Sequence, residues 1–326
     1  MRFAPTDDQQ LFAETVRDLF SAECQPSVVR AAWEGKRSQK LWGQLADMGV
    51  VSMLASEEQG GLAMSPLDLH HLLVESGRCA LPDPLVDTAA VAVPVLAGSK
   101  HAVLADVLSG NTNVGIGFEA DPFVRTDVDM LLLEHQEQWH LVSVDQTRQT
   151  SERSVDASRS LASIEWSPSD DTQITSTVAP ADGFNRAITG ISAQLLGLSD
   201  HLLYETVEYV KDREQFGKPI GVNQALKHKL SDCLVALDFA RPVVTRAAYS
   251  VSVGDPEAHV HASMAKCFAA QAAELTAKHA LQCHGAIAYT TEHDLHMWLK
   301  RIWALSRQWG DANTHRRRVG ATVLGG

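Results

Sequence analysis

The segment DREQFGKPIG, residues 212–221, carries more chemistry than a turn between two helices requires. Arg213 offers a planar guanidinium that makes charge-assisted, often bidentate hydrogen bonds to anions. Gln215 adds an amide, and Phe216 adds an aromatic face. The glycines and the proline that follow are typical of a sharp, fixed corner. We therefore interpret the segment as a candidate binding corner, with Arg213 as the residue that a purely structural corner would not need.

Other patterns do not support chemistry of their own. GIGFEA, residues 115–120, has dinucleotide-binding spacing, but an Asp-Pro pair follows it where a helix would have to begin. His293 and His296 lack the three or four convergent ligands of a zinc site, so no metal is expected. Cys283 and His284 are neighbours in sequence, and adjacent side chains do not face each other on a helix.

The composition indicates a soluble, cytoplasmic protein. The chain has 326 residues, 45% of them apolar, and a net charge of −12. An acidic surface repels phosphate backbones and anionic lipid, so neither nucleic acid nor membrane is expected as a partner. The five cysteines form no CxxC pair, which favours a reduced compartment. No apolar run approaches the ~18 residues that a membrane span needs.

Three regions must position the corner. Residues 1–110 are expected to be helical, with a capping box at Thr6 and Gln9 and a helix start at Ser65. Residues 111–182 are expected to form a small β region, in which MLLLEHQEQWHLVSVD and LASIEW are strands and the Ser-, Thr- and Asp-rich stretches are loops. Residues 183–326 are expected to form an antiparallel bundle of long helices, so the fold class is mostly α.

The corner and a later segment carry a family resemblance. REQFGKPIGVNQALKHKLSD and QCHGAIAYTTEHDLHMWLKR closely resemble the two signatures of the acyl-CoA dehydrogenase family. PTDDQQLFAETVRDLF and LADMGVVSMLASEEQGG resemble the opening helices of that family and its Pro-Glu-x-x-Gly-Gly loop, with Ala55 and Ser56 where the proline is expected. The resemblance covers about the first 75 residues and everything after about residue 183.

The resemblance implies an N-terminal helical domain, a central β domain and a C-terminal four-helix bundle. It also implies FAD, an acyl-CoA thioester substrate, and a flavin shared across a subunit interface. One subunit holds the flavin ring with its β domain, and its neighbour holds the ADP end with the corner. The FAD contacts that the resemblance implies here are Arg213, Gln215, Phe216, Gln224, Gln282 and Gly285.

The departures from the family concern the other half of that site. The family's Thr-Glu-Pro-x-x-Gly-Ser-Asp and Trp-x-Ser/Thr-Asn segments, which cradle the flavin ring, are missing between residues 106 and 183, and the region is short. The two positions where the family places its catalytic glutamate fall on Gly310 and near Ala187. Asp311 is one residue away but has a shorter side chain. No catalytic base is therefore assigned to this chain.

The pattern of retention and loss leads to a hypothesis. The chain retains the residues that a subunit contributes to its neighbour's FAD site, and it lacks the residues that bind the flavin ring in its own site. We therefore interpret it as one subunit of an obligate heteromer with a catalytic acyl-CoA dehydrogenase. It resembles the short subunit of the actinobacterial α2β2 enzymes of steroid side-chain oxidation. Two alternatives stay open: a stand-alone dehydrogenase with an unrecognised base, and a flavin-free structural or regulatory subunit.

Overall fold

The computed structural model describes residues 3–325, and its N-terminal part is helical, as the sequence predicts. Capping boxes at Thr6–Gln9 and Ser65–Asp68 begin the first and fourth helices. A buried π-helical turn over Val86–Ala92, which the sequence analysis did not predict, leads directly into the fifth helix. The helices are α1 (Asp7–Glu23), α2 (Pro26–Trp33), α3 (Gln39–Asp47), α4 (Pro66–Arg78), α5 (Val93–Ser99) and α6 (Leu104–Leu108).

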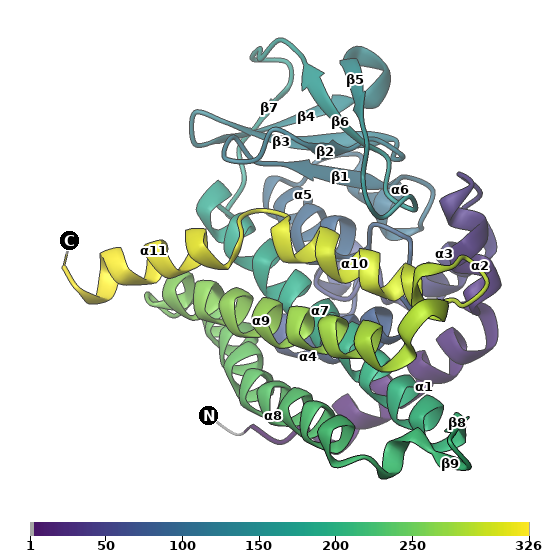
Figure 1. Ribbon diagram of the computed structural model, residues 1–326. Helices are drawn as coiled ribbons and strands as arrows, with labels where there is room; N and C mark the ends of the chain where they lie inside the picture. The colour runs from purple at the N-terminus through teal and green to yellow at the C-terminus, as the bar shows by residue number, and fades with distance from the viewer. Residues whose placement is uncertain (1–2, 326) are drawn as a thin grey trace.

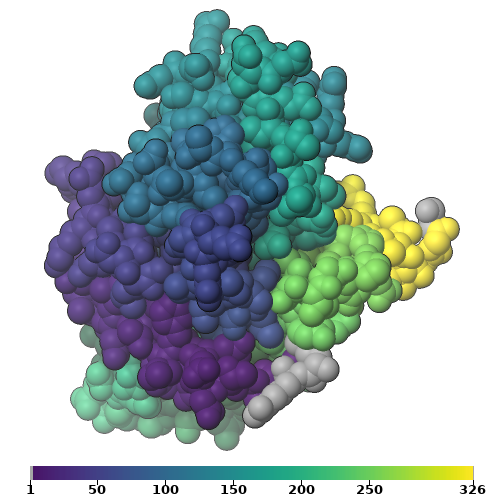
Figure 2. Space-filling view, turned by 180° about the vertical axis from the view of Figure 1, so that it is seen from behind, coloured from purple at the N-terminus to yellow at the C-terminus, as the bar shows by residue number. Residues whose placement is uncertain are grey.

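The C-terminal part is a bundle of long helices (Figure 1). They are α7 (Pro180–Asp212), α8 (Gln224–Val253), α9 (Ala258–His284), α10 (Leu295–Arg307) and α11 (Ala312–Val323). Two glycines let α4 and α7 touch backbone to backbone: a Cβ on Gly77 would lie 2.1 Å from the Gln194 carbonyl oxygen, and one on Gly197 would lie 1.8 Å from that of Val74. This contact joins the N-terminal helices to the bundle, and Figure 2 shows the N-terminal part over the left and lower side of the rear face, below the β region.

The β region lies on one end of this helical body (Figure 1). One sheet has the order β1-β3-β4-β7, the other β2-β6-β5. The predicted strand pair forms a hairpin in which Gln136 and Glu137 both have positive φ, and GIGFEA contributes to a strand instead of starting a helix. The strands are β1 (Val114–Gly117), β2 (Val124–Arg125), β3 (Met130–His135), β4 (Gln138–Ser143), β5 (Arg148–Glu152), β6 (Leu161–Glu165) and β7 (Gln173–Ile174).

The Ser-rich stretch between residues 145 and 160 is not the simple loop that its composition indicated. It contains β5 and then folds inward, where Asp156 and Ser158 are buried. Arg301 of α10 forms a buried ion pair with Asp156, donates a hydrogen bond to the Ser158 hydroxyl, and donates another to the Leu81 carbonyl at 2.7 Å. One arginine therefore ties the β region, the bundle and the N-terminal part together.

Two polar segments make contacts inside the fold. Arg316–Arg318 lie in the middle of α11, where Arg318 contacts the Phe184 ring and donates to Asn185. His296 is buried edge-on against Trp33. Within residues 3–325, no group of three or more His, Cys, Asp or Glu side chains could hold a metal ion. In the same range, no helix combines the length and the apolarity that crossing a membrane requires.

Candidate functional site

The corner after α7 is a small two-stranded hairpin. Strands β8 (Glu214–Gln215) and β9 (Lys218–Pro219) pair antiparallel across a two-residue turn. Phe216 and Gly217 form the turn with φ of +53° and +75°, the positive values that a type I′ hairpin requires. A glycine adopts this region freely, whereas a phenylalanine is strained there. Phe216 is also 99% exposed, so the fold holds an aromatic ring outward at a backbone cost.

Arg213 caps the C-terminal end of α7 with its backbone and keeps its side chain free. Its N–H donates to the Tyr209 carbonyl at 2.9 Å, and its own carbonyl accepts from the Ile220 N–H at 2.8 Å. The guanidinium is exposed, and within residues 3–325 it has no hydrogen-bond or ion-pair partner. The arginine is therefore placed by the chain but used by no other part of it.

The remaining predicted contacts lie at the same end of the bundle. Gln224 is the exposed first residue of α8, and Gln282 is exposed in the last turn of α9. Gly285 ends α9 with φ +66° and ψ −137°, and a Cβ there would meet only open space. Tyr209 of α7 stacks on His284 at 4.2 Å between ring centroids and donates its hydroxyl to the His284 carbonyl at 3.4 Å. This contact joins the ends of α7 and α9, so the two sequence signatures share one surface.

The adjacent pair Cys283 and His284 is structural. The His284 ring is buried, its Nδ1 lies 2.9 Å from the Ala280 carbonyl, and burial lowers its pKa. Burial raises the pKa of the Cys283 thiol, which disfavours the thiolate. These positions therefore support the corner and do not form a nucleophile.

The corner and the β region lie at opposite ends of the molecule (Figure 1). Helix α7 starts near the sheets and runs for 33 residues to the corner, roughly 50 Å at the α-helical rise of 1.5 Å per residue. A dinucleotide is much shorter than this. One cofactor therefore cannot contact Arg213 and the β region of the same chain.

A second candidate region is a cleft of about 640 Å³ between the β region and α10. The apolar side chains on its wall are Phe123, Val155, Leu161 and Trp303, and three arginines, Arg153, Arg159 and Arg307, also line it. Gly310, one of the two positions where a base would be expected, is part of this wall. Sequence reasoning missed Arg159, because it sits in a polar stretch without periodicity or a recognisable motif.

The carboxylates near Gly310 are engaged in fixing the backbone. Asp311 is the N-cap of α11, and it accepts from the Thr314 N–H at 2.8 Å and from the Thr314 hydroxyl; these bonds lower its pKa. Asp121 lines the cleft, but its two oxygens accept the Phe123 and Trp309 N–H groups at 3.2 and 3.0 Å. Neither carboxylate is free to face a substrate in the arrangement that the chain adopts.

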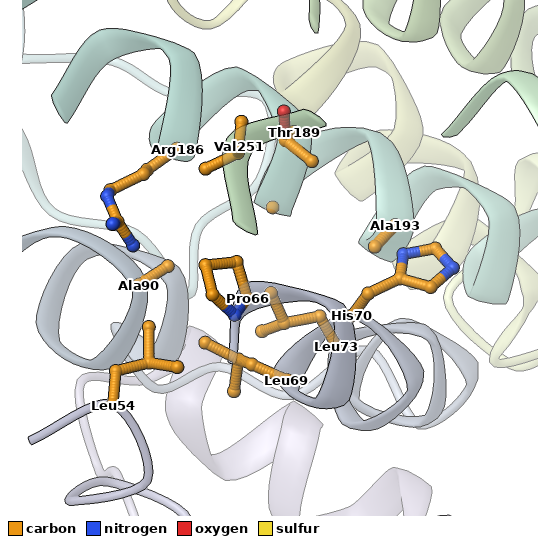
Figure 3. Close-up of a pocket in the computed structure, with 11 residues that line it drawn as sticks. Leu54, Pro66, Leu69, His70, Leu73, Ala90, Arg186, Thr189, Ala193 and Val251 are labelled. Carbon is orange, nitrogen blue, oxygen red and sulfur yellow. The ribbon is translucent and has the colours of Figure 1, made fainter. Parts of the chain in front are cut away.

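The second possible base position is closed. Ala187 is fully buried in α7. A cavity next to it, lined by its neighbour Arg186, has a volume of about 20 Å³ and lies between Leu69 and Leu73 of α4 and Thr189 of α7 (Figure 3). That is about the space of one water molecule. No acyl chain fits there.

Comparison with known proteins identifies the family. The acyl-CoA dehydrogenase N-terminal domain matches residues 6–109, and the C-terminal domain of the same family matches residues 179–324. The chain is 30% identical to acyl-CoA dehydrogenase IpdE2 of Mycobacterium tuberculosis over 307 residues, which cover 91% of each protein. The chain therefore belongs to the acyl-CoA dehydrogenase family.

Solved structures agree on the fold. The ChsE4-ChsE5 complex from Mycobacterium tuberculosis contains a chain that superposes with a TM-score of 0.89 at 22% identity, over 100% of both chains. The Tcur3481-Tcur3483 steroid ACAD G363A variant contains a chain that superposes with a TM-score of 0.86 at 21% identity, over 98% of both. The mostly α, acyl-CoA dehydrogenase-like architecture predicted from the sequence is confirmed.

Proposed function

We propose that this chain is one subunit of a heteromeric, FAD-dependent acyl-CoA dehydrogenase. It completes the FAD site of a catalytic partner through the corner after α7, and the partner supplies the flavin-ring half of the site and the catalytic base. The reaction is α,β-desaturation of an acyl-CoA thioester, with a steroid side-chain thioester as the substrate. The chain alone is inactive.

The observation that carries the proposal is the outward presentation of Arg213 and Phe216. An unpaired guanidinium and a strained, exposed phenyl ring have no use inside the chain. The separation of roughly 50 Å along α7 prevents them from serving a cofactor bound to the chain's own β region. Both residues gain a use when a second subunit brings a cofactor to them.

The residues of the corner fit the ADP end of FAD. Arg213 would hold the pyrophosphate through charge-assisted hydrogen bonds, and Phe216 would pack against the cofactor beside it. Around Gly285 the surface is open and carries no Cβ, so a phosphate can approach the end of α9 without a clash, although the Gly285 N–H itself donates to the Leu281 carbonyl. The bound flavin supplies the acceptor for the hydride that leaves the β-carbon of the substrate.

The chain's own cleft supports the division of labour. Gly310 provides no proton acceptor, Asp311 is used as a helix cap, and Ala187 has no room beside it. α-Proton abstraction needs a carboxylate within hydrogen-bond reach of the α-carbon. The base therefore has to come from the partner.

An apolar surface for the partner lies on α8, the helix that starts at the corner. One face of α8 is buried in the bundle, and the other exposes the large apolar side chains Leu234, Val235 and Phe239. Apolar patches of this kind are typical of subunit contacts. The likeness to a chain of the ChsE4-ChsE5 complex supports a heteromer, and the likeness to the Tcur3481-Tcur3483 steroid ACAD supports a steroid thioester.

One preparation tests the proposal against both alternatives. The chain is expressed alone and together with a candidate catalytic acyl-CoA dehydrogenase from the same organism, and flavin absorbance and native mass are measured. We expect no FAD in the chain alone and one FAD per two chains in the complex. Stoichiometric FAD in the isolated chain would favour the stand-alone enzyme, and a flavin-free complex would favour the structural subunit. Either result would overturn the proposal.

A further inference from the structure

Arg159, in the cleft between the β region and α10, is a buried cation without a partner. It is only 6% exposed and follows the turn that Arg301 holds in place. Within residues 3–325 its guanidinium forms no hydrogen bond and no ion pair. A buried unpaired charge is costly, so folded proteins seldom keep one without a use. Burial and the nearby Arg125 lower the pKa of Arg159 to about 10, which still leaves it charged at neutral pH.

The charge around Arg159 is asymmetric. Asp156 and Asp87 favour its charge, but Asp156 is already paired with Arg301 and with the Ser158 hydroxyl. The two exposed arginines of the cleft, Arg153 and Arg307, add positive charge at its edge. An anion that enters would meet the mostly buried guanidinium of Arg159 and the exposed one of Arg153, while Arg307 lies 3.8 Å from Glu274 and the Asp121 carboxylate uses its oxygens on backbone N–H groups.

Most of the rest of the wall is apolar, although Asp121, Ser154 and Gln308 also line it. Phe123, Val155 and Trp303 are large side chains that stay partly exposed around the cleft, and Leu161 lies among them. A volume of about 640 Å³ lies within the range of small-molecule sites. Inorganic phosphate would pair with the guanidinium but leave this apolar surface exposed to water. A ligand that uses both features has one anionic group on a rigid or extended apolar body.

We propose that the cleft binds an amphiphilic carboxylate, with Arg159 paired to the carboxylate and Trp303, Phe123 and Val155 against the apolar body. The planar guanidinium matches the two oxygens of a carboxylate. This site is independent of the FAD corner, which lies at the other end of α7. It gives the cleft a binding role in a chain whose position 310 carries no base.

The test is calorimetric titration of the full chain with cholate, which joins one carboxylate to an apolar ring system. We expect cholate to bind the wild type 1:1. Its affinity for Arg159→Met should be lower by about tenfold or more, the loss expected for a hydrogen-bonded charge. Arg148→Met is the matched control, because Arg148 is exposed on β5 outside the cleft, and it should bind as the wild type does. The neutral methyl ester of cholate should bind weakly, and its affinity should be the same for the wild type and for Arg159→Met.

Two further measurements keep the proposal falsifiable. Trp303→Ala keeps the charge and removes apolar wall, so it should weaken cholate binding even if Arg159→Met fails to fold. The melting temperature of Arg159→Met should be no lower than that of the wild type, because the substitution removes a buried charge without a partner. Absence of cholate binding, equal binding to Arg159→Met, or binding of coenzyme A in place of cholate through its phosphates would overturn it.

Discussion

The corner after α7 and the cleft beside α10 each hold an arginine with no partner in the described part of the chain, in opposite surroundings. Arg213 is exposed at the end of a helix, next to the fully exposed Phe216. Arg159 is 6% exposed on the wall of an open, mostly apolar cleft. An exposed unpaired guanidinium is solvated by water and costs little, whereas a buried one loses that solvation.

This difference decides what each arginine can recognise. The corner offers no enclosing walls, so a ligand there needs a second surface to cover it. A cofactor bound to another subunit meets that need. In the cleft, the chain supplies apolar walls against which a small molecule can pack. The following experiments test this contrast, from the largest expected effect to the smallest.

The largest effect should come from Arg301→Met, which removes the anchor of the cleft. Asp156 would be left as an unpaired buried carboxylate, and breaking a buried pair in this way costs about 3–5 kcal/mol. We expect the free energy of unfolding in urea to fall by about that amount. Arg307→Met on the exposed side of the same helix should change it by less than about 0.5 kcal/mol. Similar losses in both variants would show that the cleft does not depend on its internal charges.

Arg213→Ala should release FAD from the assembled complex without altering the fold. Loss of a charged hydrogen bond costs roughly 1.5–3 kcal/mol, which corresponds to a tenfold or greater loss of FAD affinity. The isolated chain should unfold at the same urea concentration as the wild type, because the side chain has no partner there. FAD affinity that stays unchanged in a flavin titration would make the corner arginine a structural residue.

Lys266 should make the cleft side of the molecule sensitive to pH. Its buried ammonium donates to the Leu305 and Gln308 carbonyls at 2.7 and 2.9 Å, and burial lowers its pKa to about 7 from 10.5. Between these values the unfolded chain binds more protons than the native one, so stability rises with pH. We expect the free energy of unfolding to increase by about 1–2 kcal/mol from pH 7 to pH 9.

The control for this pH dependence is Lys266→Met, in which the rise between pH 7 and pH 9 should disappear. Loss of the four carbonyl contacts should lower its stability at all pH values. An identical slope in the variant would assign the pH dependence to other groups. The corner variant Arg213→Ala should keep the wild-type slope, since it lies far from Lys266.

The smallest effect is expected for Phe216→Asn. Asparagine tolerates the left-handed backbone region, and Asn-Gly is a favoured type I′ turn, so the isolated chain should gain about 0.5–1 kcal/mol of stability. The complex should bind FAD more weakly, because the exposed ring is gone. Urea unfolding and flavin titration measure the two quantities, and a simultaneous loss of both would make Phe216 a structural residue.

The sequence was sufficient for the elements whose signals are local. Capping at Thr6 and Ser65, the strand pair around Gln136, and the end of α7 before Gly217 all follow from neighbouring residues. It was not sufficient for β5 and the turn after it. Asp156 and Ser158 are buried because Arg301, more than 140 residues later, reaches them, and no local pattern encodes that contact.

The candidate site divides in the same way. The corner residues could be named because their spacing matches a family signature, and Tyr209 then explains how the structure joins them to the end of α9. Arg159 could not be named, because an arginine among serines has no periodicity and belongs to no signature. Its importance arises only from what surrounds it after folding.

The position of the corner at the far end of α7 has a consequence for how such an assembly behaves on dilution. A cofactor that bridges two subunits raises their mutual affinity by the same factor by which the second subunit raises cofactor affinity. Flavin and quaternary structure would therefore be lost together as the protein concentration falls, and added FAD would delay that loss. Under the proposed function, specific activity would then depend on the protein concentration and on the ratio of the two subunits.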